Sequence, residues 1–286
     1  MLTRIIADKR RELAERKKNR ESPPVGQLLT EEAPSFRGAI SRDDCNVIAE
    51  IKYQSPSHGP FLCQDPPEEI AESYVRAGAA AISVLTDAKH FHGSLEHLRR
   101  VRARLDEIPG AHTAEGAGLT EEAFSQTPLL RKDFILDPVQ VDEARSFGAS
   151  AFLLIAACLS ADELSSLRGH GEELGMDALV EVHDLFELDA AIESGASIIG
   201  VNNRNLRSFE VDLRTSFDMA RRMEGESGYL LVAESGISEP SQLGELRDAG
   251  FCAFLLGTIL MNSASPGRRL SELLRAAAKR GDAVGS

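Results

Sequence analysis

Eight short apolar runs in this sequence of 286 residues end in residues that can do chemistry. Two lysines, Lys52 and Lys132, and three carboxylates, Glu50, Glu181 and Glu234, stand at or beside these ends. Residues two apart on a strand share a face, so Glu50 and Lys52 project together. Lysines and carboxylates in one site can keep each other charged and supply acids and bases near neutral pH. A structural ion pair is the alternative for any single one of them, but their convergence favours an acid-base site.

Neutral hydrogen-bonding groups and small residues follow the later runs. Asn202 ends the sixth run and Arg204 follows it, and a guanidinium is a planar cation suited to an oxyanion. The alternative for this Asn-rich stretch is a loop that satisfies its own backbone. After the seventh and eighth runs come Ser235-Gly236 and Gly257-Thr258, whose small side chains let backbone N–H groups approach a phosphate. The two pairs together predict a phosphate site, for which Gly257-Thr258 alone would be weak evidence.

The runs themselves predict parallel β-strands. They are nearly continuous in apolar residues and alternate with amphipathic helical segments, which favours a parallel sheet covered by helices. The strands are predicted at Val47–Lys52, Ala81–Thr86, Leu129–Lys132, Ala151–Ile155, Ala178–Val182, Ile198–Val201, Leu230–Glu234 and Ala253–Leu256. The helices are predicted at Pro67–Ala77, Leu95–Leu105, Pro138–Phe147, Ala161–Leu174, Asp184–Glu193, Arg214–Met223, Pro240–Ala249 and Pro266–Lys279.

Glycine follows the end of several of these helices, as at Gly78 and Gly250, where it can take the left-handed conformation that ends a helix. Eight strand-helix units predict an α/β fold, the (β/α)8 TIM barrel, as a catalytic domain over residues 46–286. All strand ends would then meet at one mouth, and the loops after strands seven and eight are the usual phosphate site. An open doubly wound sheet is the alternative, weakened because no Gly-x-Gly-x-x-Gly turn follows the first strand.

Residues 1–45 are expected to form an N-terminal helical extension. Apolar residues recur at near-helical spacing in Met1–Lys18, and acids and bases alternate between them, with Asp8 and Arg11 three residues apart. Transit peptides are poor in acids, so we expect a mature amphipathic helix and not a targeting segment. Two further segments are interpreted as connections: Glu21–Ala33, and the long Glu107–Thr127 at the face opposite the mouth.

Composition and charge argue against several classes of function. The net charge of −13 argues against nucleic acid or an anionic membrane as a partner, and no apolar run is long enough to cross a bilayer. The four scattered cysteines form no Cys-x-x-Cys pair, so no disulfide framework or zinc site is predicted and a reducing cytoplasm fits best. His90, His92 and His97 lack a carboxylate or cysteine to complete a metal site. We expect a monomer or weak homo-oligomer that binds a small phosphorylated molecule.

The motifs at the strand ends resemble, in order, those of indole-3-glycerol phosphate synthase. The resemblance runs from the N-terminal helix to the last strand, and its occurrence at almost every strand end makes it specific. The motifs are Ile48-Ala49-Glu50-Ile51-Lys52, Ser55-Pro56-Ser57, Ile82-Ser83-Val84-Leu85-Thr86-Asp87, Gly93-Ser94-Leu95, Leu130-Arg131-Lys132-Asp133-Phe134-Ile135, Val180-Glu181-Val182-His183, Gly200-Val201-Asn202-Asn203-Arg204-Asn205-Leu206 and Glu234-Ser235-Gly236-Ile237.

The resemblance implies a carboxy-lyase of tryptophan biosynthesis without cofactor or metal. It would convert 1-(o-carboxyphenylamino)-1-deoxyribulose 5-phosphate into indole-3-glycerol phosphate, with release of carbon dioxide and water. Lys132 would be the general acid of ring closure, and Glu50 would orient it and keep it charged. Lys52, as an acid or carboxylate anchor, and Glu181, as the base, would serve the later dehydration. The remaining implied roles are substrate positioning by Asn202 and Glu234, and phosphate binding by Ser55, Ser235, Gly236, Gly257 and Thr258.

The anilino ring of that substrate needs an apolar slot. Phe91, Phe134 and Leu153 are candidates, although each could equally be ordinary core. His90 stands where the family more usually has an aromatic residue. Two other hypotheses are kept: a different phosphate-binding barrel such as phosphoribosylanthranilate isomerase, whose acid-base pair would be a cysteine and an aspartate, and a non-catalytic scaffold. A scaffold should have lost at least one strand-end charge, and none is lost here.

Overall fold

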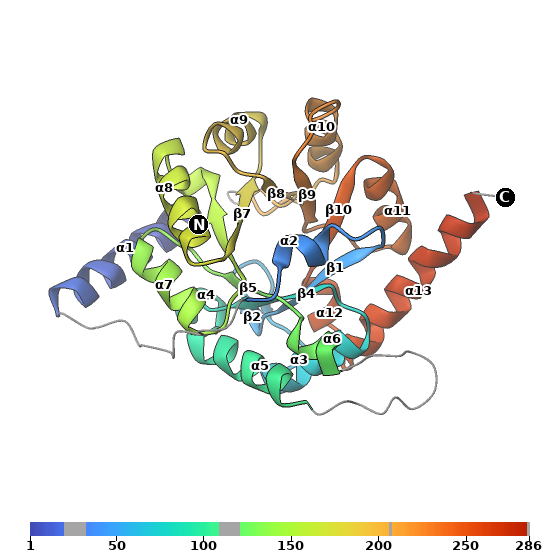
Figure 1. Ribbon diagram of the computed structural model, residues 1–286, viewed down its shortest axis with the longest axis horizontal. Coiled ribbons are helices and arrows are strands. Elements are labelled where there is room, and N and C mark those ends of the chain that lie inside the picture. The colour runs from blue at the N-terminus through green and yellow to red at the C-terminus, as the bar shows by residue number, and fades with distance from the viewer. Residues whose placement is uncertain (20–32, 109–120, 206–207, 285–286) are drawn as a thin grey trace.

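Eight parallel strands close into a barrel in the computed structural model, which describes residues 1–19, 33–108, 121–205 and 208–284 (Figure 1). The first strand pairs with both the second and the last strand of the barrel, so the sheet has no free edge and the predicted TIM barrel is confirmed. In the order around the barrel the strands are β1 Asn46–Ile51, β10 Phe251–Leu256, β9 Leu230–Glu234, β8 Ile198–Asn202, β7 Asp177–Val182, β6 Ala151–Ile155, β5 Leu129–Lys132 and β4 Ala81–Leu85.

Strand β10 departs most from its predicted bounds, because it begins at Phe251 and not at Ala253. The pairing of β10 with β9 shifts register between these two residues, so that Phe251 pairs with Leu231 and Ala253 with Val232. Such an irregularity places two residues opposite one and breaks the alternation from which strand bounds are predicted.

The predicted helices are also confirmed, and they surround the barrel in Figure 1. Glycines with positive φ follow several of them as expected, for example Gly78 with φ 96° and Gly250 with φ 102°. These helices are α3 Pro67–Arg76, α5 Leu95–Glu107, α7 Pro138–Ser146, α8 Ala161–Glu173, α9 Leu185–Glu193, α10 Arg214–Arg222, α11 Pro240–Asp248 and α13 Pro266–Val284.

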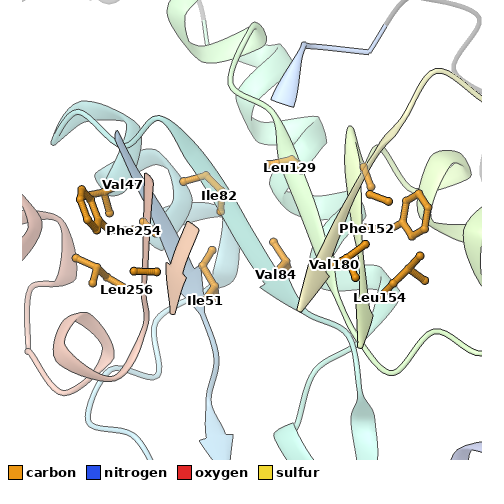
Figure 2. Packing of buried hydrophobic residues seen from close by; sticks show 14 of the residues in the cluster. Val47, Ile51, Ile82, Val84, Leu129, Phe152, Leu154, Val180, Phe254 and Leu256 are labelled. Atoms are coloured by element: carbon orange, nitrogen blue, oxygen red, sulfur yellow. The ribbon is translucent and has the colours of Figure 1, made fainter. Parts of the chain in front are cut away.

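Alternation along each strand separates two apolar cores. Outward residues such as Val84, Leu129 and Phe254 pack beneath the helices in a large cluster, part of which is shown in Figure 2. Inward residues such as Leu130 and Val232 fill the barrel itself in a smaller cluster. Residues two apart on a strand share a face. An inward apolar residue in the first part of a strand is therefore followed, two positions later, by an inward residue at the mouth of the barrel.

A short helix that was not predicted, α2 Phe36–Ile40, closes the N-terminal end of the barrel. Its residues Phe36 and Ile40 are fully buried and pack against inward residues near the strand starts, including Ile48. The side chain of Asn46 donates hydrogen bonds to the carbonyls of Ile40 and Cys252 at 3.1 and 2.9 Å. Five residues are too few to show a helical period, so helix α2 is not evident from the sequence.

Helix α1 Leu2–Lys18 lies against the barrel at the opposite, C-terminal end of the strands. Its buried face includes Lys9, whose Nζ lies 3.1 Å from a carboxylate oxygen of Asp87 and 3.1 Å from one of Asp133. Burial opposes the charge on Lys9, but the attraction of Asp133 and Asp87 outweighs it and raises the pKa of the lysine. The expected pair between Asp8 and Arg11 is present on the outer side.

The remaining described elements are short. They are the hairpin of β2 Gln54–Ser55 and β3 Gly59–Pro60, and the helical turns α4 Ala88–Phe91, α6 Glu121–Ser125, η1 Ala156–Cys158 and α12 Thr258–Met261. Most of the two predicted connections, at 20–32 and 109–120, lies outside the described residues. No helix in the described parts of the chain combines the length and apolar character needed to cross a membrane.

Substitution of Lys9 by Met should destabilise the fold by about 3 kcal/mol, because it leaves buried carboxylates without their shared cation. The matched control is Lys17→Met. Lys17 pairs with Asp137 at the surface, where its side chain is 65% exposed against 7% for Lys9, so its loss should cost about 1 kcal/mol or less. Denaturant unfolding monitored by circular dichroism gives both free energies. Equal values for the two variants would contradict the role given to Lys9.

Candidate active site

A cavity of about 690 Å³ opens at the C-terminal ends of the barrel strands. The structure brings all of the predicted site residues to its wall, although they come from separate parts of the chain. These residues are Glu50, Lys52, Ser55, Phe91, Lys132, Phe134, Glu181, Asn202, Arg204, Glu234, Ser235, Gly236, Gly257 and Thr258. The convergence follows from the barrel, because parallel strands present all their C-terminal ends on one side.

Lys132 lies at the centre of the charged groups in this cavity. Its Nζ contacts Oε2 of Glu181 at 2.8 Å and Oε2 of Glu234 at 2.5 Å, so one lysine joins strands β5, β7 and β9. The second oxygen of Glu181 accepts a hydrogen bond from Nδ2 of Asn202 at 3.0 Å. The second oxygen of Glu234 is buried and accepts no hydrogen bond from the described residues.

The protonation states of this cluster are set by burial and by mutual attraction. Burial opposes the charge on Lys132, but Glu181 and Glu234 outweigh it and raise its pKa. Burial would raise the pKa of Glu181, yet Lys132, with further help from His183 and Asn202, lowers it to about 2. Burial, together with the neighbouring Glu181, raises the pKa of Glu234 to about 7 against the pull of Lys132. The two carboxylates titrate as a pair, so one ionised and one proton-exchanging carboxylate face the cavity near neutral pH.

Glu50 does not have the partner that the family resemblance implied. It forms an ion pair with Lys52, with 2.6 Å between Oε1 and Nζ, while the described contacts of Lys132 are to Glu181 and Glu234. The influence of Glu50 on Lys132 is therefore through longer-range charge only. The mouth holds two separate lysine-carboxylate groups, either of which can exchange protons.

Two glycines make room for the carboxylates. A Cβ atom on Gly200 would lie 2.2 Å from Oε1 of Glu234, and one on Gly257 would lie 2.1 Å from Oε1 of Glu50. Both distances are far shorter than a van der Waals contact. Each carboxylate therefore occupies the space that a side chain at the glycine position would fill. Gly200 was not among the predicted site residues. Its only signal in the sequence is a glycine within an apolar strand, which can mark a close approach.

The predicted phosphate loops have tight backbone geometry. Ser235 and Gly236 follow β9 with φ of 63° and 83°, and a positive φ at a serine is an uncommon, strained conformation that often marks a functional site. A Cβ on Gly236 would lie 2.5 Å from Val211, so glycine is needed there. Gly257 precedes the short helix α12, which starts at Thr258. The sequence did not indicate that Arg269, in the first turn of α13, reaches the same rim.

The opposite part of the wall is apolar. The rings of Phe91 and Phe134 lie 6.1 Å apart at an angle of 40°, and Leu153 lines the cavity with them. Helix α1 adds Leu2 and Ile5, two of the apolar residues that recur at helical spacing in the N-terminal segment. Aromatic and aliphatic side chains at this end suit a flat ring, and they lie apart from the loops that suit a phosphate.

The Asn-rich loop after β8 makes hydrogen bonds both within itself and to residues of the site. Asn202 bonds to Glu181 as described, and its Oδ1 also accepts a hydrogen bond from the backbone N–H of Arg204 at 3.0 Å. The side chain of Asn203 donates to the carbonyls of Glu234 and Ser235 at 3.1 and 3.2 Å, which fixes the end of β9. The loop thus satisfies part of its own backbone, as the alternative interpretation expects, while Asn202 also contacts the charged centre; the Arg204 guanidinium donates a hydrogen bond to the carbonyl of Phe209 at 3.2 Å.

Comparison with known proteins agrees with this geometry. Solved structures of thiamine phosphate pyrophosphorylase from Pyrococcus furiosus (TM-score 0.56, 13% identity, 82% of this chain and 96% of that one) and of KGPDC from Streptococcus mutans (TM-score 0.58, 11% identity, 82% and 98%) share the fold. The closed barrel with lysines and carboxylates at its mouth defines a TIM-barrel enzyme.

A model of the family described as Indole-3-glycerol phosphate synthase matches residues 2–273. Proteins named indole-3-glycerol phosphate synthase from Desulfotalea psychrophila and Koribacter versatilis are 43% and 41% identical to this chain, over 96% of it and 98% of their own lengths. The chain belongs to the indole-3-glycerol phosphate synthase family.

Gly200→Ala should lower turnover on the order of 100-fold with little loss of substrate affinity, because the added methyl group pushes Glu234 away from Lys132. Gly244→Ala on α11 is the matched control, since nothing lies within 4 Å of a Cβ at that position. Steady-state kinetics with the family's substrate measures both. In a Glu234→Ala background the Gly200→Ala change should have a much smaller effect on thermal stability and residual activity, because the closest remaining atom to the added Cβ is then Leu179 Cδ1, at 3.3 Å. An equal loss in both backgrounds would mean that Gly200 acts on the barrel and not through Glu234.

Proposed function

We propose that this protein is a carboxy-lyase that converts 1-(o-carboxyphenylamino)-1-deoxyribulose 5-phosphate into indole-3-glycerol phosphate, carbon dioxide and water. The observation that carries the proposal is the buried cluster of Lys132 between Glu181 and Glu234, at the mouth of a barrel that belongs to the synthase family. The net charge of −13 and the scattered cysteines support a cytoplasmic enzyme that acts on a small molecule, as a monomer or weak homo-oligomer.

The two ends of the substrate match the two parts of the cavity wall. The phosphate would bind at Ser235-Gly236 and Gly257-Thr258, with Ser55 beside them, where backbone N–H groups can approach it closely. The anilino ring would lie against the adjoining rings of Phe91 and Phe134. The ribulose carbon chain then spans the charged centre. Holding the ring carbon against the carbonyl carbon in this way supplies much of the catalysis, because ring closure is mainly a positioning problem.

Lys132 would donate a proton to the carbonyl oxygen as the new carbon-carbon bond forms. The ring carbon that attacks carries the carboxylate, which then leaves as carbon dioxide and returns its bonding electrons to the ring. A buried ammonium that its two carboxylate partners keep charged is suited to stabilising a developing alkoxide. The resulting hydroxyl leaves as water in the dehydration, with a proton supplied by Lys52.

Glu181 would accept the proton lost in the dehydration, and its environment explains how an acidic carboxyl can do so. The pKa of Glu181 is low chiefly because Lys132 is charged beside it. Once Lys132 has given its proton to the substrate, that attraction disappears and the proton affinity of Glu181 rises. The acid step thus prepares the base for the next step. Glu50 and Lys52 form a second pair that can assist the departure of water.

Lys132→Met should reduce turnover by two to three orders of magnitude, since loss of one electrostatic group that stabilises the transition state costs about 2.7–4 kcal/mol. The test is an assay of the purified chain with the carboxyphenylamino substrate, in which indole formation is followed by absorbance or fluorescence. Lys17→Met, far from the cavity, serves as the control. If Lys132→Met keeps more than a tenth of wild-type turnover with an unchanged circular dichroism spectrum, Lys132 is not the general acid.

Glu181→Gln should lower turnover by about 10²–10⁴-fold and change substrate affinity far less, because the amide keeps the shape and removes only the proton acceptor. Turnover is measured by the same indole assay and affinity by titration of the enzyme with product. A large loss of affinity with normal turnover would make Glu181 a binding residue.

A further inference from the structure

His183 lies between two carboxylates at the edge of the proposed active site. It follows β7 directly and is two residues from Glu181. Its Nδ1 lies 3.0 Å from Oε2 of Glu187, which also accepts the backbone N–H of His183 at 2.8 Å. Its Nε2 lies 3.4 Å from Oε1 of Glu181, which is an ion-pair distance, and makes no hydrogen bond to the described residues. Only 12% of the histidine side chain is exposed, so these contacts are shielded from water.

The contacts of His183 complete the environment of Glu181. Lys132 contacts Oε2 of that carboxylate, whereas Asn202 and His183 approach Oε1. His183 does not line the cavity, and it reaches the centre only through Glu181. The steps proposed above do not use it.

We propose that His183 is a positioning residue: a protonated imidazole, anchored by Glu187, whose charge faces the Glu181 carboxylate and keeps it ionised and ready to act as the base. The inference rests on the proposed role of Glu181. The charges alternate outward from the barrel centre to helix α9, in the order Glu234, Lys132, Glu181, His183 and Glu187. In such a row each of the three inner groups, Lys132, Glu181 and His183, has an opposite charge on either side, which offsets part of the cost of burying it.

The surroundings of the imidazole favour its charged form. Burial alone would lower the pKa of His183, but the hydrogen bond to Glu187 and the charges of Glu181, Glu187 and Glu234 raise it. The Cys158 thiol is also nearby, and because burial raises its pKa to about 12 it brings no charge at neutral pH. A histidine with a raised pKa contributes its full stabilisation below its unfolded value of about 6.5 and loses it as pH rises through the folded value.

This arrangement affects catalysis only while the imidazole is charged. A cation at Oε1 helps to keep Glu181 ionised in acidic solution, where the coupled carboxylates would otherwise take up a second proton. At higher pH the imidazole becomes neutral and Glu181 is ionised without its help. The contribution of His183 to turnover is therefore expected to depend on pH, whereas a purely packing role would not.

The test is the pH dependence of kcat for wild type and His183→Gln. We expect the acid limb of the variant profile to move upward by about one pH unit, which is a loss of up to about tenfold in acidic solution, and the two profiles to converge at alkaline pH. KM should change little. The matched control is His170→Gln on α8, because His170 also pairs with a carboxylate, Asp142, but away from the cavity. A ratio of the two profiles that is constant with pH, or no difference at all, would overturn the proposal.

A second measurement does not depend on turnover. In wild-type protein, NMR titration of the imidazole that disappears in His183→Gln should give a pKa above 6.5, and Glu187→Gln should lower it. The acid limb of kcat in Glu187→Gln should move toward that of His183→Gln. A His183 pKa at or below 6.5 would overturn the proposal. Should Glu181→Gln keep normal turnover, the proposed role of Glu181 fails, while the titration still reports whether the imidazole is charged.

Discussion

The buried charge of Lys132 is the interaction on which the site depends. An ammonium group taken out of water costs several kcal/mol unless it is paired closely, and here the pairs come from two other strands of the barrel. The side chains of Glu181 and Glu234 must therefore meet above the barrel core. Gly200 leaves the space in which Glu234 can do so, and Asn202 holds the far oxygen of Glu181. Because each group of this centre contacts the others, the position of the acid is set before the substrate arrives, as electrostatic preorganisation requires.

Three successive charged residues of β5 and its end show how one strand organises its surroundings. Arg131 points outward and donates hydrogen bonds to Thr86 and to a carboxylate oxygen of Asp133. Lys132 points inward to the cavity. Burial would raise the pKa of Asp133, but Lys9 and Arg131 lower it to about 2. Asp133 binds helix α1 through its ion pair with Lys9. Adjacent residues at the end of one strand thus supply both the lysine of the site and the carboxylate that binds helix α1.

The N-terminal segment contacts both ends of the barrel. Phe36 and Ile40 seal the end away from the mouth, whereas Leu2 and Ile5 form part of the cavity wall. Lys9 fixes α1 in that place through buried charges. The apolar part of the cavity, where we place the anilino ring, is thus completed by residues outside the eight strand-helix units. Binding of the ring in the proposed place would therefore be coupled to docking of α1 through shared apolar surface.

The sequence by itself determined the barrel and the polar strand-end residues at its mouth, because both follow from local rules, whereas Arg269 and the contribution of helix α1 to the wall appear only in the tertiary structure. The alternation of strands and amphipathic helices, the glycines that end helices and the polar residues at strand ends are all properties of short segments. Parallel strands must present those ends on one side. The tertiary structure alone decided which groups pair. Glu50 contacts Lys52, Lys132 contacts Glu181 and Glu234, and Lys9 is buried against Asp87 and Asp133. These choices depend on strand register and helix docking, which bring together residues that are 49 and 102 positions apart in the case of Lys132.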